Sequence, residues 1–160
     1  GVPMMWKTGH SLIKEKMRET GAPIGGELSG HICFADDYIG SDDALYAACR
    51  LVALVAASDR SLSDTVGAFP AYVATPEIRI ELPEERKADV IDAAVAYFRA
   101  RYPVVDVDGV RVLFGDGWAL LRASNTQPVL VARFEARTKE RMEAIRSEVE
   151  SWLKAQGVHV

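Results

Sequence analysis

The chain has 160 residues, of which 49% are apolar and 26% are charged, and its formal net charge is −4. This composition is typical of a globular protein with one ordinary domain or two small ones, and because neither half carries a basic excess we expect no nucleic-acid partner. No apolar run is long enough to span a bilayer and the first residues do not resemble a signal peptide, so we expect no membrane partner and a cytoplasmic location.

Residues 1–66 alternate expected strands and helices, which is typical of an α/β domain. The expected elements are strands at residues 2–6, 24–28 and 31–35 and helices at residues 11–18 and 41–57. Ser41 is the expected N-cap of the second helix, because its hydroxyl can accept a hydrogen bond from an N–H of the first turn. The chain begins with Gly1 directly before a strand-like run. We therefore expect a piece of a longer polypeptide, with a partial α/β domain whose mixed sheet is truncated.

Residues 59–70 are polar and rich in turn formers, and we interpret them as the linker to a second domain at residues 72–160. The expected elements of this domain are strands at residues 72–81, 104–107, 110–114, 117–121 and 129–136 and helices after Pro83 and Thr138. An antiparallel sheet with both helices on one face would bury the apolar stripes of all these elements together. The expected fold class of this part is therefore α+β.

Three glycines surround a carboxylate, a hydroxyl and an imidazole in the segment 25–31, and the polar residues are Glu27, Ser29 and His31. Glycines let the backbone approach a ligand closely, and a carboxylate that accepts two hydrogen bonds suits the neighbouring hydroxyls of a sugar. The alternative interpretation is a plain turn with solvated polar side chains.

A second polar segment lies between two expected strands, at residues 122–128, and contains Arg122, Ser124, Asn125 and Thr126. The planar guanidinium of an arginine fits phosphate oxygens, and hydroxyl and amide groups add neutral donors. Successive backbone N–H groups in such a turn can form an anion-binding nest. The alternative is a hairpin loop whose Ser and Asn serve only the turn.

A third segment, residues 7–11, joins an expected strand to a helix and carries His10. Loops of this kind are common ligand sites in α/β sheets, and the alternative is a helix cap with an incidental histidine.

Cys33 and Cys49 form no metal-binding spacing, and we expect both to be reduced thiols. The acid pairs at 36–37 and 42–43 are interpreted as a solvated turn and a helix start, so we expect no metal ligand in this chain.

Taken in chain order, the three segments read WKTGHS at residues 6–11, GELSGH at 26–31 and RASNT at 122–126. This series resembles the bacterial phosphomannomutase/phosphoglucomutase family of α-D-phosphohexomutases, and the resemblance covers essentially the whole chain. The Ser-Asn-Thr form of the last segment resembles the mannose/glucose branch of the family. Leu28 stands where Met is common in that family.

The resemblance implies a role for each polar residue of the three segments. Glu27 and Ser29 would contact the ring hydroxyls. The phosphate that is not transferred would be bound by Arg122, Ser124, Asn125 and Thr126. His10 and His31 would lie at the border of the cleft. The resemblance also implies a mutase that interconverts hexose 1-phosphate and hexose 6-phosphate, through a phosphoserine and a bisphosphate that also acts as activator. The phosphoserine loop and the Mg²⁺ loop of the family have no match here. We therefore expect the later part of domain three plus domain four, inactive by itself.

The expected partner is a phosphosugar substrate. The truncated sheet would leave unpaired strand edges, which tend to pair with another chain. We therefore expect the first half of the chain either to repack or to complete its sheet by association, as a symmetric dimer. One alternative is a stand-alone phosphosugar-binding module without catalysis. Another is a structural or interaction domain whose antiparallel α+β half binds protein or RNA. An RNA-binding sheet would need exposed aromatic side chains on adjacent strands and a basic face.

Overall fold

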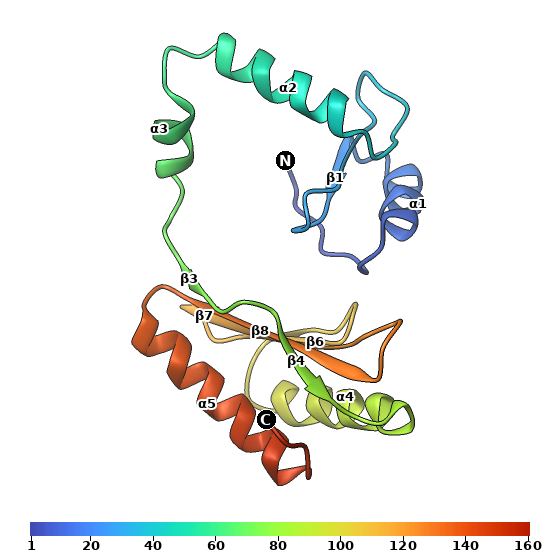
Figure 1. The fold of residues 1–160 in the computed structure, drawn as a ribbon, viewed down its shortest axis with the longest axis vertical. Helices are drawn as coiled ribbons and strands as arrows, with labels where there is room; N and C mark the ends of the chain where they lie inside the picture. The colour runs from blue at the N-terminus through green and yellow to red at the C-terminus, as the bar shows by residue number, and fades with distance from the viewer. The chain divides into compact units, whose positions relative to one another are not determined.

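The computed structural model describes residues 1–160 and separates into two units, Gly1–Pro70 and Ala71–Val160 (Figure 1). Each unit is described by itself. None of the helices combines the length and the apolar character needed to cross a membrane.

The second unit is built on a six-stranded antiparallel sheet in which β8 holds the central place. The elements in chain order are β3 (Val73–Ala74), β4 (Ile78–Glu81), α4 (Glu84–Arg99), β5 (Val104–Val105), β6 (Val110–Leu113), β7 (Gly117–Ala123), β8 (Val129–Ala136) and α5 (Lys139–Ala155). The strand order is β3-β8-β7-β6-β5, and β4 also pairs with β8. Because β8 pairs with three strands, its register fixes most of the sheet.

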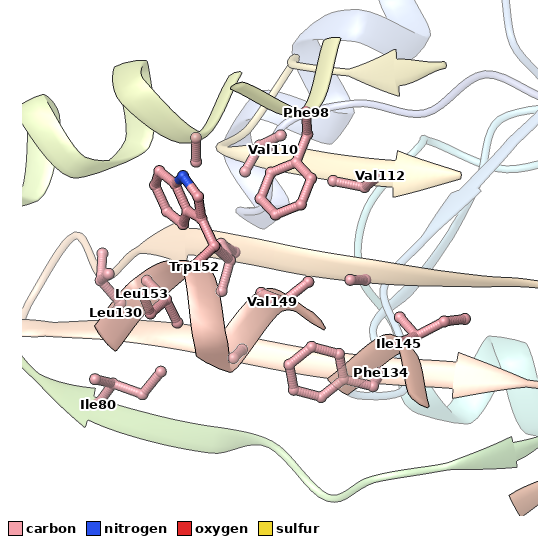
Figure 2. Packing of buried hydrophobic residues seen from close by; sticks show 14 of the residues in the cluster. Ile80, Phe98, Val110, Val112, Leu130, Phe134, Ile145, Val149, Trp152 and Leu153 are labelled. Carbon is pink, nitrogen blue, oxygen red and sulfur yellow. The ribbon is translucent and has the colours of Figure 1, made fainter. Parts of the chain in front are cut away.

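One face of this sheet carries the core of the unit, and both α4 and α5 cover that face (Figure 1). Strand residues alternate between the two faces, so every second residue of β8 is completely buried, as Leu130, Ala132 and Phe134 show. Phe98 of α4 and Trp152 of α5 meet over the sheet, with ring centroids 5.5 Å apart (Figure 2). The expected α+β arrangement, with two helices on one face, is confirmed.

The expected single strand at 72–81 is wrong, because the chain forms two strands with a break at 75–77. Three residues, 75–77, lie opposite the two residues 133 and 134 of β8, which is the arrangement of a β-bulge. Pro76 has no N–H to give to the ladder. The buried Thr75 fills the gap, since its Oγ1 accepts the Phe134 N–H at 3.1 Å and its own N–H reaches the Phe134 carbonyl at 2.9 Å.

The first unit consists of a small hairpin with three helices. Its elements are α1 (His10–Thr20), β1 (Ile24–Gly26), β2 (Ile32–Phe34), α2 (Ala44–Ala56) and α3 (Leu62–Gly67). Helix α1 packs so closely on the hairpin that a Cβ at Gly25 would lie 2.6 Å from Met17 Sδ and 2.8 Å from Ile13 Cγ2. Met17 and Cys33 are the only buried apolar residues of this unit.

Three expectations for the first unit are wrong. Residues 2–6 form no strand, because no neighbouring strand offers them hydrogen bonds. The linker at 59–70 contains α3, which begins because Ser61 Oγ accepts the Asp64 N–H at 3.1 Å.

The third concerns the start of α2, where the N-cap is Asp43 and not Ser41. The backbone of Asp42 pairs with Cys33 in an isolated bridge and stays extended. The helix therefore starts two residues later than expected, and the Asp43 carboxylate accepts the N–H groups of Leu45 and Tyr46 at 3.0 Å each.

Helix α2 is strongly apolar, yet none of its residues is buried. Leu45 and Val52 lie seven residues apart, on one helix face, and are 81% and 68% exposed. The first unit thus presents an apolar helix face in addition to the strand edges of its hairpin. The expected dimer stays a prediction, and this face is the surface that would favour it.

We expect the 160-residue chain to self-associate at micromolar concentration, and we expect Leu45→Lys together with Val52→Lys to shift it toward monomer. Charges on this face would have to be desolvated in a dimer. Sedimentation equilibrium measures the effect, and Phe69→Lys, at a 71% exposed apolar residue outside α2, is the matched control. A chain that stays monomeric at all accessible concentrations contradicts the prediction.

The core of the second unit gives a separate prediction. Phe98 is completely buried, so Phe98→Ala should lower the free energy of unfolding of this unit by about 3–5 kcal/mol. Denaturant dependence of amide hydrogen exchange in β8 measures the loss. Leu45→Ala, at a side chain that is 81% exposed, should leave β8 exchange unchanged; an equal effect of both variants would show that Phe98 has no special place in the core.

Candidate functional site

The glycine-rich segment forms the tight loop of the β1–β2 hairpin. Its backbone is closed by two hydrogen bonds, Glu27 N to His31 O at 2.9 Å and Gly30 N to Glu27 O at 3.0 Å. Gly30 has a φ of 93°, a conformation that other residues rarely adopt. The loop therefore holds Glu27, Ser29 and His31 on one short, closed turn.

The Glu27 carboxylate ties this loop to the segment before α1. Its Oε1 accepts the Gly9 N–H at 2.6 Å, and its Oε2 accepts the Ser29 hydroxyl at 3.3 Å. Two of the three segments singled out in the sequence are thus brought together, although 18 positions separate Gly9 from Glu27. The carboxylate keeps further acceptor capacity for a ligand hydroxyl.

His31 has a carboxylate partner that the sequence did not reveal. Its Nδ1 lies 2.6 Å from Asp42 Oδ2, and the two side chains are 53% and 28% exposed. The backbone bridge between Asp42 and Cys33 sets this geometry, because it places the carboxylate beside the strand that follows His31. The contact joins residues 11 positions apart in different elements, so no local pattern could indicate it. The sequence had assigned Asp42 only to a helix start.

The other reactive side chains near this loop have fewer contacts. His10 is exposed at the first residue of α1 and makes no side-chain hydrogen bond. Burial raises the pKa of the Cys33 thiol, and the negative charge of Asp42 raises it further. This thiol therefore stays protonated at neutral pH and is no nucleophile.

A hollow of about 600 Å³ lies between α1 and residues 35–41. Lys14 and Arg18 form part of its lining, but none of the expected site residues lines it.

In the second unit, Arg122 sits near the end of β7, next to the loop that leads to β8. Its Nε lies 3.9 Å from Asp108 Oδ2, and the two side chains are 18% and 25% exposed. Gly109, with a φ of 79°, lets the β5–β6 turn reach β7, since a Cβ there would collide with the backbone of Leu121 and Arg122. The close approach of this turn places a carboxylate beside the guanidinium.

The loop after Arg122 is organised around the Ser124 hydroxyl. Ser124 Oγ accepts the N–H groups of Thr126 and Gln127 at 3.4 and 3.2 Å, and Ser124 N–H reaches the Val129 carbonyl at 3.0 Å. Asn125 and Thr126 are exposed. Hydroxyl, amide and guanidinium donors therefore lie within five consecutive residues, a set suited to an anion with several oxygens.

Lys87 of α4 also contacts this loop and was missed by the sequence reasoning. Its Nζ donates to the carbonyl oxygens of Ser124 at 2.6 Å and Gln127 at 3.0 Å. A signal was present, because Lys87 lies three residues before Val90 on the helix face that also carries Ala94 and Phe98. A lysine at a core position of an amphipathic helix needs a specific partner.

The two groups of residues lie in different units, so each is a local arrangement. Neither holds a metal site, since no group of three His, Cys, Asp or Glu side chains in residues 1–160 could hold an ion. The donor set of this chain therefore does not fit Mg²⁺.

Comparison with known proteins matches each unit to one domain of one family. The sequence model described as phosphoglucomutase/phosphomannomutase, alpha/beta/alpha domain III, matches residues 1–72, and that of the C-terminal domain of the same family matches residues 77–151. A solved structure described as a phosphoglucomutase/phosphomannomutase family protein from Burkholderia thailandensis superposes with a TM-score of 0.83 at 42% identity, over 97% of this chain and 33% of that one.

Curated relatives agree with these matches. A phosphomannomutase/phosphoglucomutase of Pseudomonas aeruginosa is 46% identical over 156 residues, which is 97% of this chain and 34% of the relative. A phosphoglucomutase of Neisseria meningitidis serogroup A is 44% identical over 158 residues, again 97% and 34%. The chain thus spans about a third of the length of the relatives it matches, and it belongs to the phosphoglucomutase/phosphomannomutase family as its domain III and C-terminal domain.

Proposed function

We propose that this chain is the substrate-binding part of a phosphohexomutase that interconverts the 1-phosphate and the 6-phosphate of mannose or glucose. The observation that carries the proposal is the pair of loops, one with a carboxylate and a hydroxyl and one with a guanidinium and several neutral donors, each in a unit that matches one domain of the same family. A phosphosugar offers the two complementary groups, hydroxyls and a phosphate.

The first loop is assigned to the sugar ring. Glu27 Oε1 and Oε2 already accept hydrogen bonds from Gly9 and Ser29, so the carboxylate is fixed in place before a ligand arrives, and its remaining lone pairs can accept from ring hydroxyls. Ser29 can turn its hydroxyl to donate or accept. Such fixed donors and acceptors reduce the ordering cost of binding.

The second loop is assigned to the phosphate that does not react. Arg122 supplies the charge, and Ser124, Asn125 and Thr126 supply neutral donors around it. A mutase must accept its substrate in two orientations. A loop that binds whichever phosphate lies away from the reacting group can be used in both orientations. The transferred phosphoryl group would come from a phosphoserine outside this chain, with a hexose bisphosphate as intermediate and activator.

His31 is the group of this chain suited to move a proton. With Nδ1 held by Asp42 at 2.6 Å, the Nε2 atom is left to accept the proton of a sugar hydroxyl that attacks the phosphoryl group. His10 follows Gly9, whose N–H binds Glu27, but the His10 ring has no hydrogen-bond partner that would orient it. Since the residues present do not fit Mg²⁺, ligands for that ion would belong to another part of the protein, which we place in the cytoplasm.

The phosphate assignment predicts the effect of one truncation. Arg122→Ala should weaken binding of phosphosugar by the whole enzyme by on the order of 2–3 kcal/mol, the scale of hydrogen bonds to charged groups, and should abolish the weak binding of inorganic phosphate to this chain. Enzyme kinetics and NMR titration of the loop amides measure the two effects. Arg101→Ala is the control, because Arg101 stacks on Tyr97, its guanidinium carbon 3.8 Å from the ring centroid. Unchanged phosphate binding in Arg122→Ala rejects the assignment.

The histidine assignment predicts a tautomer. In the neutral imidazole of His31 the proton should reside on Nδ1, because the Asp42 carboxylate accepts it. Asp42→Asn should shift the proton toward Nε2, since the amide group can donate to Nδ1 instead of accepting from it. Long-range ¹H–¹⁵N correlation spectra of the ring distinguish the two forms.

Asp37→Asn is the matched control for this measurement. Asp37 is an exposed carboxylate in the same turn and makes no contact with the ring, so its loss should leave the tautomer as it is. A mixture of tautomers in the unmodified protein that Asp42→Asn does not alter would reject the pairing.

A further inference from the structure

Lys87 is the only charged side chain that the protein buries, with an exposed fraction of 4%. An ammonium group has three N–H donors and no acceptor. All three have a partner here, namely the carbonyls of Ser124 and Gln127 at 2.6 and 3.0 Å and the Glu84 carboxylate at 2.7 Å. Lys87 is therefore a fully satisfied buried cation whose partners include two backbone groups of the Arg122 loop.

The two carbonyls belong to the first and last residues of the loop 124–127, so one ammonium group clamps both of its ends. The peptide bond after Ser124 is planar and trans, which makes its C=O and the N–H of Asn125 point in opposite directions. Because the Ser124 carbonyl points at the buried Lys87, the Asn125 N–H points away from the core. Asn125 is exposed, so this N–H is directed at solvent.

The Ser124 N–H reaches the Val129 carbonyl at 3.0 Å, but the peptide group between Ser124 and Asn125 has no protein partner other than Lys87. Ser124 Oγ serves the N–H groups of Thr126 and Gln127, Arg79 holds the side chain of Gln127 at 2.6 Å, and Leu82 N–H holds the carbonyl of Pro128 at 3.0 Å. These contacts fix the second half of the loop and its exit. The orientation of the Ser124–Asn125 peptide depends on the lysine.

We propose that Lys87 is a positioning residue of the phosphate loop, which turns the Asn125 N–H outward as a donor for a phosphate oxygen. The inference rests on the proposed phosphate site and adds a residue of α4 to it. Lys87 itself lies beneath the loop and acts through the backbone. Without it the buried Ser124 carbonyl would lose its donor, and the peptide would rotate to hydrate that carbonyl, because an unsatisfied buried acceptor is costly.

The test is a titration of the 160-residue chain with inorganic phosphate, followed by the ¹⁵N–¹H signals of residues 124–127. Lys87→Met retains an unbranched apolar stem of similar length and removes the ammonium group. It should raise the dissociation constant for phosphate roughly tenfold, which corresponds to about 1.4 kcal/mol. The Asn125 amide, which should shift with phosphate in the unmodified chain, should respond much less in the variant.

Arg86→Met is the matched control. Arg86 is the neighbouring residue of α4 and also donates to backbone carbonyls, with Nη2 2.8 Å from the Gln156 oxygen, but these lie after α5 and not in the loop. Both variants should lower the melting temperature, and only Lys87→Met should change phosphate affinity. Equal phosphate affinity of folded Lys87→Met and the unmodified chain would reduce Lys87 to a purely structural residue and overturn the proposal.

Arg122→Ala distinguishes a failure of the role proposed for Lys87 from a failure of the proposed phosphate site itself. If Arg122→Ala binds phosphate as well as the unmodified chain does, the phosphate site itself is rejected, and with it the role of Lys87. If Arg122→Ala loses binding and Lys87→Met retains it, only the role of Lys87 fails. Should Lys87→Met not fold, the ζ-¹⁵N signal of Lys87 in the unmodified chain decides: a shift that follows the phosphate titration together with the Asn125 amide supports the proposal, and no shift overturns it.

Discussion

The register of β8 is the constraint on which the second unit depends. This strand pairs with β3, β4 and β7, and its alternation directs Leu130, Ala132 and Phe134 into the core beneath α4 and α5. The same register fixes the hairpin with β7. It therefore also fixes the position of the loop 124–127, which carries hydroxyl and amide hydrogen-bond donors. A slip of one residue would turn the core face to solvent and displace this loop at the same time. The packing of the core and the position of this loop are therefore set by one ladder of hydrogen bonds.

The first unit holds its candidate site by other means. It buries only Met17 and Cys33 among its apolar residues, so the positions of its polar side chains depend on specific hydrogen bonds. The Glu27 carboxylate joins the hairpin loop to Gly9, and the bridge between Cys33 and Asp42 brings a carboxylate to His31. The apolar face of α2 is not covered within this unit, whereas the second unit closes its own core.

The two loops illustrate different ways to prepare a polar site. In the first unit a carboxylate is fixed by backbone and hydroxyl donors and keeps lone pairs for a ligand. In the second unit an arginine is flanked by Asp108 on one side, and the loop that follows it is supported from below by Lys87. The buried lysine and the buried Thr75 are the two polar residues that the protein takes out of water. Both serve backbone groups that the sheet and its loops would otherwise leave without partners.

The sequence by itself determined the class of each unit, most helices and strands of the second unit, and the loops that carry Glu27, Ser29, Arg122 and Ser124. These follow from local information, since periodicity, caps and turn residues act within a few positions of the chain. Tertiary structure decided the contacts between distant positions: Asp42 with His31, Gly9 with Glu27, Asp108 with Arg122, and Lys87 with the loop 124–127. It also decided where α2 begins, because the bridge from Cys33 holds Asp42 extended, and where the strand at 72–81 breaks, because a bulge opposite β8 must accommodate Pro76. Hydrogen bonds between residues far apart in sequence form only once the sheet register is set, and no local pattern records them.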